Sequence, residues 1–229
     1  MADKPSRALV LYGDGLARFV KTHIHSLASV ASCGFLSLPE TENERVVREF
    51  SHLLDASEPT LAERFMGLKA ALVTIGLDVF QFSEIASKLL RLLGFEGGNC
   101  LDVSLYDSVF VHIIIDSLIG SIMKMAQPGS EIVPRLHLSV VLSYGSVTDM
   151  NPALAGLIPR QSYTMRGEDV RQYCPMLVAQ WQHAVTRKDL VDTLSFEALK
   201  KLCGNLVIPA DRFIHEVAFK LWKAPKYGA

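Results

Sequence analysis

The fold is decided by the stretch Ser108-Val109-Phe110-Val111-His112-Ile113-Ile114-Ile115. It is rich in β-branched and aromatic residues and shows no alternation between polar and apolar positions. A strand that covers a core on one face alternates, whereas a strand buried on both faces reads as a continuous apolar run. The stretch therefore predicts a central strand of a sheet with helices on both sides, and Asp116 stands at its end.

Similar apolar runs on either side of this stretch predict further strands. The first is Ala8-Leu9-Val10-Leu11-Tyr12, which is closed by the tight turn Gly13-Asp14-Gly15. The others are Leu68 to Thr74, His137 to Ser143 and a shorter run from Pro175 to Ala179. Open α/β sheets place their sites in the loops that follow such strands. We therefore expect functional residues directly after these runs.

Segments with helical spacing of apolar residues lie between the expected strands. We expect a helix over 22–33 with Gly34 as its C-cap, a second over 40–55, and a third from the N-cap Ser83 to Leu93 that stops at Gly94. A fourth is expected over 196–203 after the N-cap Ser195. A last helix is expected after Pro209, with Phe213, Val217, Leu221 and Trp222 facing inward. Strand followed by helix is the rhythm of an α/β protein. The chain is thus predicted to be a three-layer α/β/α core with a mostly parallel central sheet.

Composition and charge limit the function classes. With 229 residues, 49% of them hydrophobic, the chain is expected to form one domain over 1–229. Its 23 Lys and Arg residues balance 24 Asp and Glu residues, so we expect neither a nucleic acid nor a membrane as partner. The four cysteines contain no C-x-x-C pair, and no apolar run is long enough to span a membrane. A cytoplasmic location, with access to the nucleus, is the expectation.

One segment is unusually long for a connection. Residues 144–173 are rich in Gly, Pro, Ser and Asn, which predicts a long loop that binds a ligand or partner. Its Arg160 and Arg166, with Arg171, could form a phosphate pocket because guanidinium groups bind phosphate through two parallel hydrogen bonds. The alternative is a solvated loop without such a pocket.

Several motifs occur in an order that resembles a known family. The segment Tyr106-Asp107-Ser108-Val109-Phe110-Val111-His112-Ile113 is similar to the family motif YDFVFVHIK, and the opening strand with Gly13-Asp14-Gly15 resembles the family's first strand and its metal-binding aspartate. The ending Lys226-Tyr227-Gly228-Ala229 resembles KFGA. The family is that of the archaeal-type cofactor-independent phosphoglycerate mutases. The resemblance implies an alkaline-phosphatase-like core.

The departures from this family concern its catalytic residues. No string of the type G-S-D-x-x-H, which carries the family's serine nucleophile, occurs between Gly34 and Gly67. The family's strand-end motif TDEAGHD is matched by Ile115-Asp116-Ser117-Leu118-Ile119-Gly120-Ser121, where only the aspartate remains. The chain is also shorter than the family, so we expect the cap domain to be missing and 40–67 to be a reduced helical remnant in its place.

The resemblance leaves Asp14 and Asp116 as remnants of a metal site. Two carboxylates cannot build a two-metal phosphoryl-transfer centre, although they could hold a single Mg or Mn ion with waters. The alternative is that Asp14 serves its turn and that Asp116 caps the helix after its strand. We expect no catalytic residue and no cofactor.

The sequence therefore favours a catalytically inactive phosphoglycerate-mutase-like protein that acts as a binding or scaffold subunit. Its expected partner is a protein, and a phosphorylated small molecule is a second expected ligand. The alternative is a reduced metal-dependent phosphatase or a 2,3-bisphosphoglycerate-independent phosphoglycerate mutase-like enzyme. That enzyme would use Asp14 and Asp116 with one cation.

Overall fold

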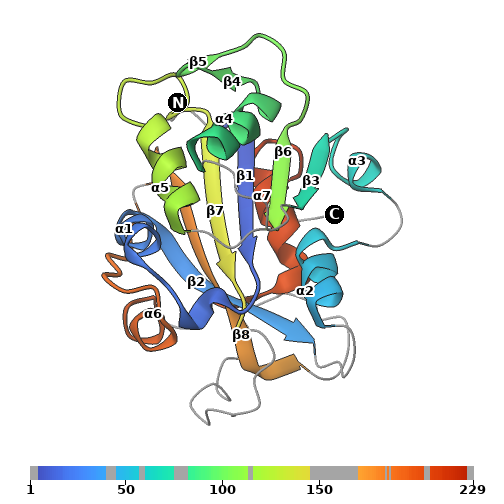
Figure 1. Ribbon diagram of the computed structural model, residues 1–229. Coiled ribbons are helices and arrows are strands. Elements are labelled where there is room, and N and C mark those ends of the chain that lie inside the picture. Colours follow the sequence, from blue (N-terminus) through green and yellow to red (C-terminus); the bar gives the residue numbers. More distant parts are fainter. Residues whose placement is uncertain are drawn as a thin grey trace.

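The structure is a computed structural model of the chain, and it describes residues 5–39, 45–56, 60–74, 82–112, 116–144, 170–183, 185, 187–203 and 207–225. Its centre is a seven-stranded sheet with the order β3-β6-β1-β7-β8-β2-β9 (Figure 1). The strands are β1 (Arg7–Gly13), β2 (Ser32–Pro39), β3 (Ala70–Thr74), β6 (Ser108–His112), β7 (Leu136–Leu142), β8 (Val170–Gln182) and β9 (Val207–Pro209). Only β8 runs antiparallel to its neighbours, so the predicted mostly parallel sheet is confirmed.

Helices cover both faces of the sheet and complete three layers. One face carries α1 (Thr22–Val30), α4 (Phe82–Leu92), α5 (Asp116–Met125) and α6 (Phe196–Leu202). The other carries α2 (Arg45–Leu54), α3 (Leu61–Arg64) and α7 (Phe213–Lys220). The remaining described elements are the 3-10 helices η1 (Leu16–Arg18) and η3 (Ala210–Arg212) and the hairpin of β4 (Phe95–Glu96) and β5 (Asn99–Cys100). The expected α/β/α architecture is confirmed.

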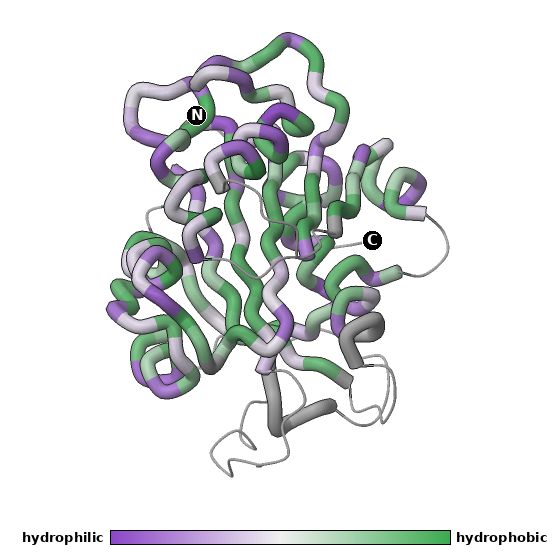
Figure 2. The backbone as a smooth tube through the Cα atoms, viewed as in Figure 1, coloured by the Kyte–Doolittle hydropathy of each residue, from purple (hydrophilic) through white to green (hydrophobic). Residues whose placement is uncertain are grey.

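The centre of the sheet is apolar on both faces. Leu9 and Leu11 of β1 pack into the core under α1, α4 and α5, whereas Val10 and Tyr12 pack into the core under α2 and α7. The apolar colour of the central strands is visible in Figure 2. The prediction of a doubly buried strand is confirmed for β6, where Val109, Phe110 and Val111 are at most 1% exposed. Residues 113–115 lie outside the described residues.

Strand β2 corrects the expectation of a helix over 22–33. Helix α1 ends at Val30, and Gly34 lies inside β2 instead of capping the helix. The small residues Ala31, Ser32 and Cys33 extend the helical spacing in the sequence, which concealed the boundary. Buried Phe35 and Leu36 explain the strand, because they alternate between the two cores.

Strand β8 is longer than predicted. It begins at Val170, so the end of the expected loop over 144–173 belongs to the sheet. Residues 145–169 lie outside the described residues. The strand pairs with β7 on one side and β2 on the other, and it joins the two halves of the sheet.

Within 40–67, the described residues 45–56 and 60–67 contain two short helices, α2 and α3. Leu53 of α2 is 0% exposed and packs in the same core as Phe213 and Val217 of α7. Thr60 and Glu63 form a capping box at the start of α3, since the Thr60 side chain accepts from the Glu63 amide and Glu63 accepts from the Thr60 amide. The described residues of this segment thus contain two helices, and its place as the remnant of a cap domain stays a prediction.

The C-terminal part agrees with the prediction except at two places. Phe213, Val217 and Leu221 are buried as expected. Trp222 is 63% exposed, because α7 ends at Lys220 and the left-handed backbone of Trp222, with φ of 61°, turns the side chain out of the helical stripe. Strand β9 was not predicted, because it has only three residues.

Among the described helices, none combines the length and the hydropathy that crossing a membrane would require.

A row of polar side chains is buried within the sheet. Ser108, His137 and Ser139 are 0% exposed, and Ser108 and His137 both lie in register with Ala8. His137 Nε2 lies 2.8 Å from Ser139 Oγ. Burial, together with the positive charge of Lys220 on α7, holds the pKa of His137 well below its usual range. The His137 imidazole is therefore neutral in the folded protein.

We expect the free energy of unfolding to fall as the pH is lowered from about 7.5 to about 5.5. Unfolded His137 takes up a proton near its ordinary pKa of about 6.5, and the folded protein resists this uptake. The contribution of neutral His137 to the free energy of unfolding is therefore fully present above about pH 6.5. Below that pH it falls by up to about 1.4 kcal/mol per pH unit.

Urea unfolding followed by circular dichroism measures this loss. The His137→Gln variant should lose less stability than the wild type over the same interval. His215 accounts for part of the remainder, because burial lowers its pKa too. Equal losses in both proteins would show that His137 is not the titrating group.

Helix α4 ends at a position that only glycine suits. Gly94 follows the helix with φ of 78°, in the left-handed region, and its amide donates to the Arg91 carbonyl at 2.9 Å. A Cβ there would lie 2.9 Å from Ser104 Cβ and 3.2 Å from Ser104 Cα. The predicted stop at Gly94 is confirmed, although the helix begins at Phe82, so Ser83 lies inside it.

The Gly94→Ala substitution should therefore destabilise the protein more than Gly67→Ala. Both positions have left-handed backbones, with φ of 78° and 74°, but no atom lies within 4 Å of a Cβ at Gly67. Gly67→Ala should cost about 1–2 kcal/mol through the backbone alone, and Gly94→Ala at least about 1 kcal/mol more through overpacking. Urea unfolding of the two variants gives the difference, and equal costs would mean that the Ser104 segment moves aside freely.

Candidate functional site

Polar side chains gather where β1, β6 and β7 end. Because the three strands are adjacent and parallel, the residues after them share one edge of the sheet. His112 ends β6, Asp14 follows β1 and Ser143 follows β7. We call the group formed by Tyr12, Asp14, Glu49, His112 and Ser143 the edge cluster.

Asp14 and Ser143 join the ends of β1 and β7. Ser143 Oγ donates to Asp14 Oδ1 at 2.9 Å and accepts from the Gly15 amide at 3.1 Å. The backbone of Ser143 adds two bonds, one to the Gly13 carbonyl and one from the Ala17 amide, each 3.0 Å long. Asp14 thus takes part in holding the Gly13-Asp14-Gly15 turn against β7.

Tyr12 and Glu49 form the buried part of the edge cluster. The Tyr12 hydroxyl donates to Glu49 Oε2 of α2 at 2.6 Å, and the two residues are 0% and 4% exposed. Burial is the first cause that raises the pKa of Tyr12, and the charge of Glu49 is the second. The phenol therefore keeps its proton as a hydrogen-bond donor. Its ring also contacts Phe50 and half-buried His112, with centroids 5.4 and 5.5 Å away.

Sequence reasoning did not single out Glu49, although a signal was present. The apolar stripe of α2 contains Val46, Phe50 and Leu53. Glu49 follows Val46 by three positions and precedes Leu53 by four, so it lies on the apolar face of the helix. An acid on such a face requires a buried partner, which here is Tyr12.

Asp116 connects α5 to the beginning of α1. Its Oδ1 accepts from the Ile24 amide at 2.8 Å, and its Oδ2 accepts from the His23 amide at 3.2 Å. The N-cap residue of α1 is Lys21, whose side chain makes no capping bond. Asp116 therefore performs the capping that Lys21 cannot, and its charge also suits the positive end of the helix dipole. The expected alternative was a cap on its own helix.

The predicted phosphate-binding residues fall mostly outside the described part. Arg160 and Arg166 lie outside the described residues altogether. Arg171 belongs to β8, where its backbone pairs with Leu38, and its side chain is outside the description. The phosphate pocket therefore stays a prediction.

A second polar cluster ties α2, α3 and α7 together. Arg64 donates to the carboxylate of Asp55 and, at 2.6 Å, to its backbone carbonyl. Arg64 Nη2 also lies 3.1 Å from His215 Nε2. The same His215 nitrogen lies 3.2 Å from Asp55 Oδ2, so it faces both a donor and an acceptor. Burial lowers the pKa of His215, which favours the neutral ring. The cluster is a structural tie between three helices.

The chemistry open to the edge cluster is limited by its burial. Ser143, which donates to a carboxylate as a nucleophilic serine would to its base, is only 1% exposed. Tyr12 and Glu49 are equally closed to solvent. Over the described part of the chain, no three His, Cys, Asp or Glu side chains lie close enough to hold a metal ion. As folded, Tyr12, Glu49 and Ser143 join elements from within the core, whereas Asp14 and His112 are half-buried.

We expect Asp116→Ala to cost about 1–2 kcal/mol of stability, because it removes the cap of α1. Asp116→Asn should cost less, since one side-chain acceptor remains. Adding Lys21→Asn to Asp116→Ala should recover part of the loss by providing a cap within the helix itself. Thermal and urea unfolding give these differences. If Asp116→Ala is neutral, the cap is not what this carboxylate contributes.

Comparisons with known proteins concern the fold. No family model matches the chain, and no curated protein matches it. Among solved structures, the chain is similar to the PH0037 protein from Pyrococcus horikoshii, with 13% sequence identity, a TM-score of 0.56 and coverage of 100% of both chains. The likeness extends over the whole α/β/α core, and the chain shares the fold of that protein.

Proposed function

We propose that the chain is a catalytically inactive relative of the archaeal-type cofactor-independent phosphoglycerate mutases and acts as a binding or scaffold subunit. The burial of Tyr12, Glu49 and Ser143 in the edge cluster carries this proposal. At the edge where such a fold would perform chemistry, Tyr12, Glu49 and Ser143 are at most 4% exposed and are bonded within the protein. An alkaline-phosphatase-like origin of the core belongs to the same proposal.

The hydrogen bonds of Asp14 and Asp116 support the proposal of an inactive protein. A two-metal centre needs ligands around cations about 3.5–4 Å apart, so its carboxylates must be available to metal. Here both oxygens of Asp116 accept amides of α1, and Asp14 accepts the hydroxyl of Ser143. These bonds give both aspartates a structural role that needs no catalysis.

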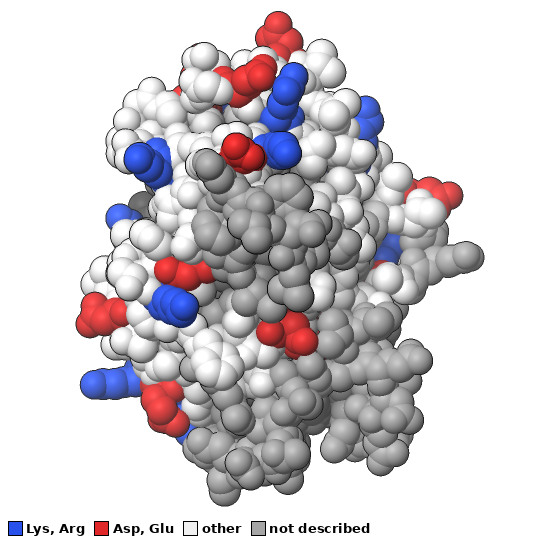
Figure 3. All heavy atoms as spheres, in the orientation of Figure 1, with Lys and Arg blue, Asp and Glu red and all other residues white. Residues whose placement is uncertain are grey.

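A protein is the partner that the surface favours. Leu101, Val103 and Leu105 are 39%, 79% and 65% exposed and lie within five residues of one another, between β5 and β6. Such a group of exposed apolar side chains on one loop is suited to contact with another protein. Figure 3 shows positive and negative side chains interspersed over one face, which gives no reason to expect nucleic acid there.

A second candidate function is a reduced metal-dependent phosphatase that uses one Mg or Mn ion. The presence of two carboxylates, Asp14 and Glu49, in the edge cluster favours it, because hard cations prefer oxygen ligands. It requires that the cluster opens to admit substrate. The two candidates differ in metal content and in turnover.

The wild-type protein should retain less than about 0.1 metal ion per chain after loading with manganese, zinc and magnesium followed by dialysis, as measured by mass spectrometry. It should also show no hydrolysis of p-nitrophenyl phosphate and no mutase activity on 3-phosphoglycerate. Both results follow from carboxylates that are already engaged by internal donors.

The Asp14→Asn variant separates the outcomes. Stoichiometric metal and a turnover that Asp14→Asn abolishes would favour the phosphatase and overturn the proposal that the protein is catalytically inactive. A turnover that persists in Asp14→Asn would contradict both candidates, because the activity would then come from another site or from a contaminant.

A further inference from the structure

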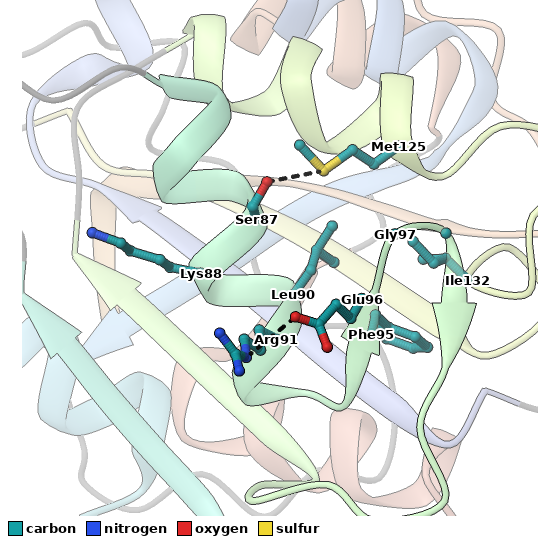
Figure 4. Close-up of a pocket in the computed structure, with 10 residues that line it drawn as sticks. Ser87, Lys88, Leu90, Arg91, Phe95, Glu96, Gly97, Met125 and Ile132 are labelled. Atoms are coloured by element: carbon teal, nitrogen blue, oxygen red, sulfur yellow. Dashed lines mark hydrogen bonds and ion pairs between the residues drawn. The ribbon is translucent and has the colours of Figure 1, made fainter.

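A cavity of about 350 Å³ opens between α4, the β4–β5 hairpin and the end of α5 (Figure 4). The residues that line it are Ser87, Lys88, Leu90, Arg91, Phe95, Glu96, Gly97, Gly98, Met125 and Ile132. None of them belongs to the edge cluster. The volume falls at the small end of the range of about 300–1,000 Å³ that is typical of sites for small molecules.

The floor of the cavity is apolar and already formed. Leu90 of α4, Phe95 of β4 and Ile132 are only 2%, 1% and 2% exposed, so they are fixed by the core behind them. Met125 closes one side, and its sulfur lies 3.9 Å from Ser87 Oγ. Met side chains adapt to the shape of a ligand more readily than branched residues do. An apolar body of a ligand would be desolvated here without a change of fold.

The mouth stays open because the hairpin turn consists of glycines. Gly97 and Gly98 have φ of 59° and 88°, and no atom lies within 4 Å of the place where either would carry a Cβ. The turn therefore borders the cavity with backbone alone. No side chain of the turn competes with a ligand for the entrance.

Arg91 is the group at the mouth that can bind an anion. Lys88 of the same helix also lines the cavity, but its amine points away from it in Figure 4, and Glu96 is the one acid among the lining residues. Arg91 Nε lies 3.6 Å from Glu96 Oε1, with side chains 71% and 55% exposed. An exposed pair of this kind contributes little stability, about 0–1 kcal/mol, so an incoming carboxylate can replace Glu96 at small cost. Figure 4 shows the pair at the border of the cavity.

We propose that this cavity binds a small amphipathic carboxylate, with its apolar body on Leu90, Phe95 and Ile132 and its charged group beside Arg91. The match is one of shape and charge: an apolar, preformed floor and an arginine at the mouth whose ion pair with Glu96 is exposed. The proposal is independent of the proposed function, because it involves neither the edge cluster nor the two aspartates.

Fluorescence of 8-anilinonaphthalene-1-sulfonate with the full-length protein tests the site, because this probe combines an apolar body with an anionic group. Binding should saturate, and decanoate should displace the probe. Ser87→Phe should weaken probe binding at least about tenfold, because the added ring occupies a cavity of small volume. Ser87 is exposed on α4, so this variant should fold like the wild type.

Ser117→Phe is the matched control. It places the same ring on an exposed site of α5, roughly two helical turns from Met125 and outside the cavity lining. Its probe affinity should equal that of the wild type. Circular dichroism and the unfolding midpoint check that both variants are folded.

The charge of the ligand is tested with two further variants. Arg91→Gln should weaken decanoate binding about threefold to fivefold, and Glu96→Gln should strengthen it by a similar factor. Decanol, the neutral counterpart, should respond to neither substitution and should compete less well than decanoate.

Two results would overturn the proposal. Probe binding that is equal in Ser87→Phe and Ser117→Phe, or that is absent in the wild type, would show that the cavity is not a ligand site. Equal competition by decanol and decanoate, without an effect of Arg91→Gln, would show that the ligand class is wrong.

Discussion

The position of β1 between β6 and β7 is the constraint on which the rest of the structure depends. A strand in the middle of a sheet must have its backbone groups paired on both sides, and one that is apolar on both faces must be covered twice. β1 meets both requirements, because Leu9 and Val10 lie in opposite cores. The helix layers follow from this burial. The same pairing brings Asp14, His112 and Ser143 to one edge.

The sequence revealed the parts of the fold that are local. Continuous apolar runs identified β1, β3, β6 and β7, and Gly94 identified the end of α4. It did not reveal β2, where Gly34 reads as a helix cap. Nothing near Gly34 in the chain indicates its partner, since β2 pairs with residues of β8 and β9 that lie more than a hundred positions away.

For the candidate site, too, the sequence predicted the local placement of residues but not their distant partners. Asp14 and Asp116 could be placed at strand ends from the sequence, but their bonding partners could not. Asp14 meets Ser143 from 129 positions away, and Asp116 meets Ile24 from 92 positions away. Such contacts depend on the order of strands in the sheet. They change the interpretation of both residues, because each carboxylate contributes to holding a turn or a helix.

The place of β2 has a consequence for biosynthesis. A ribosome makes β2 early, yet its sheet partners are β8, from Val170, and β9, which ends at Pro209. Before β8 and β9 are made, both edges of an apolar strand that contains Phe35 and Leu36 therefore lack these partners. Unpaired apolar edges associate readily with other chains. The nascent chain thus carries an apolar strand that stays unpaired until β8 and β9 have been made.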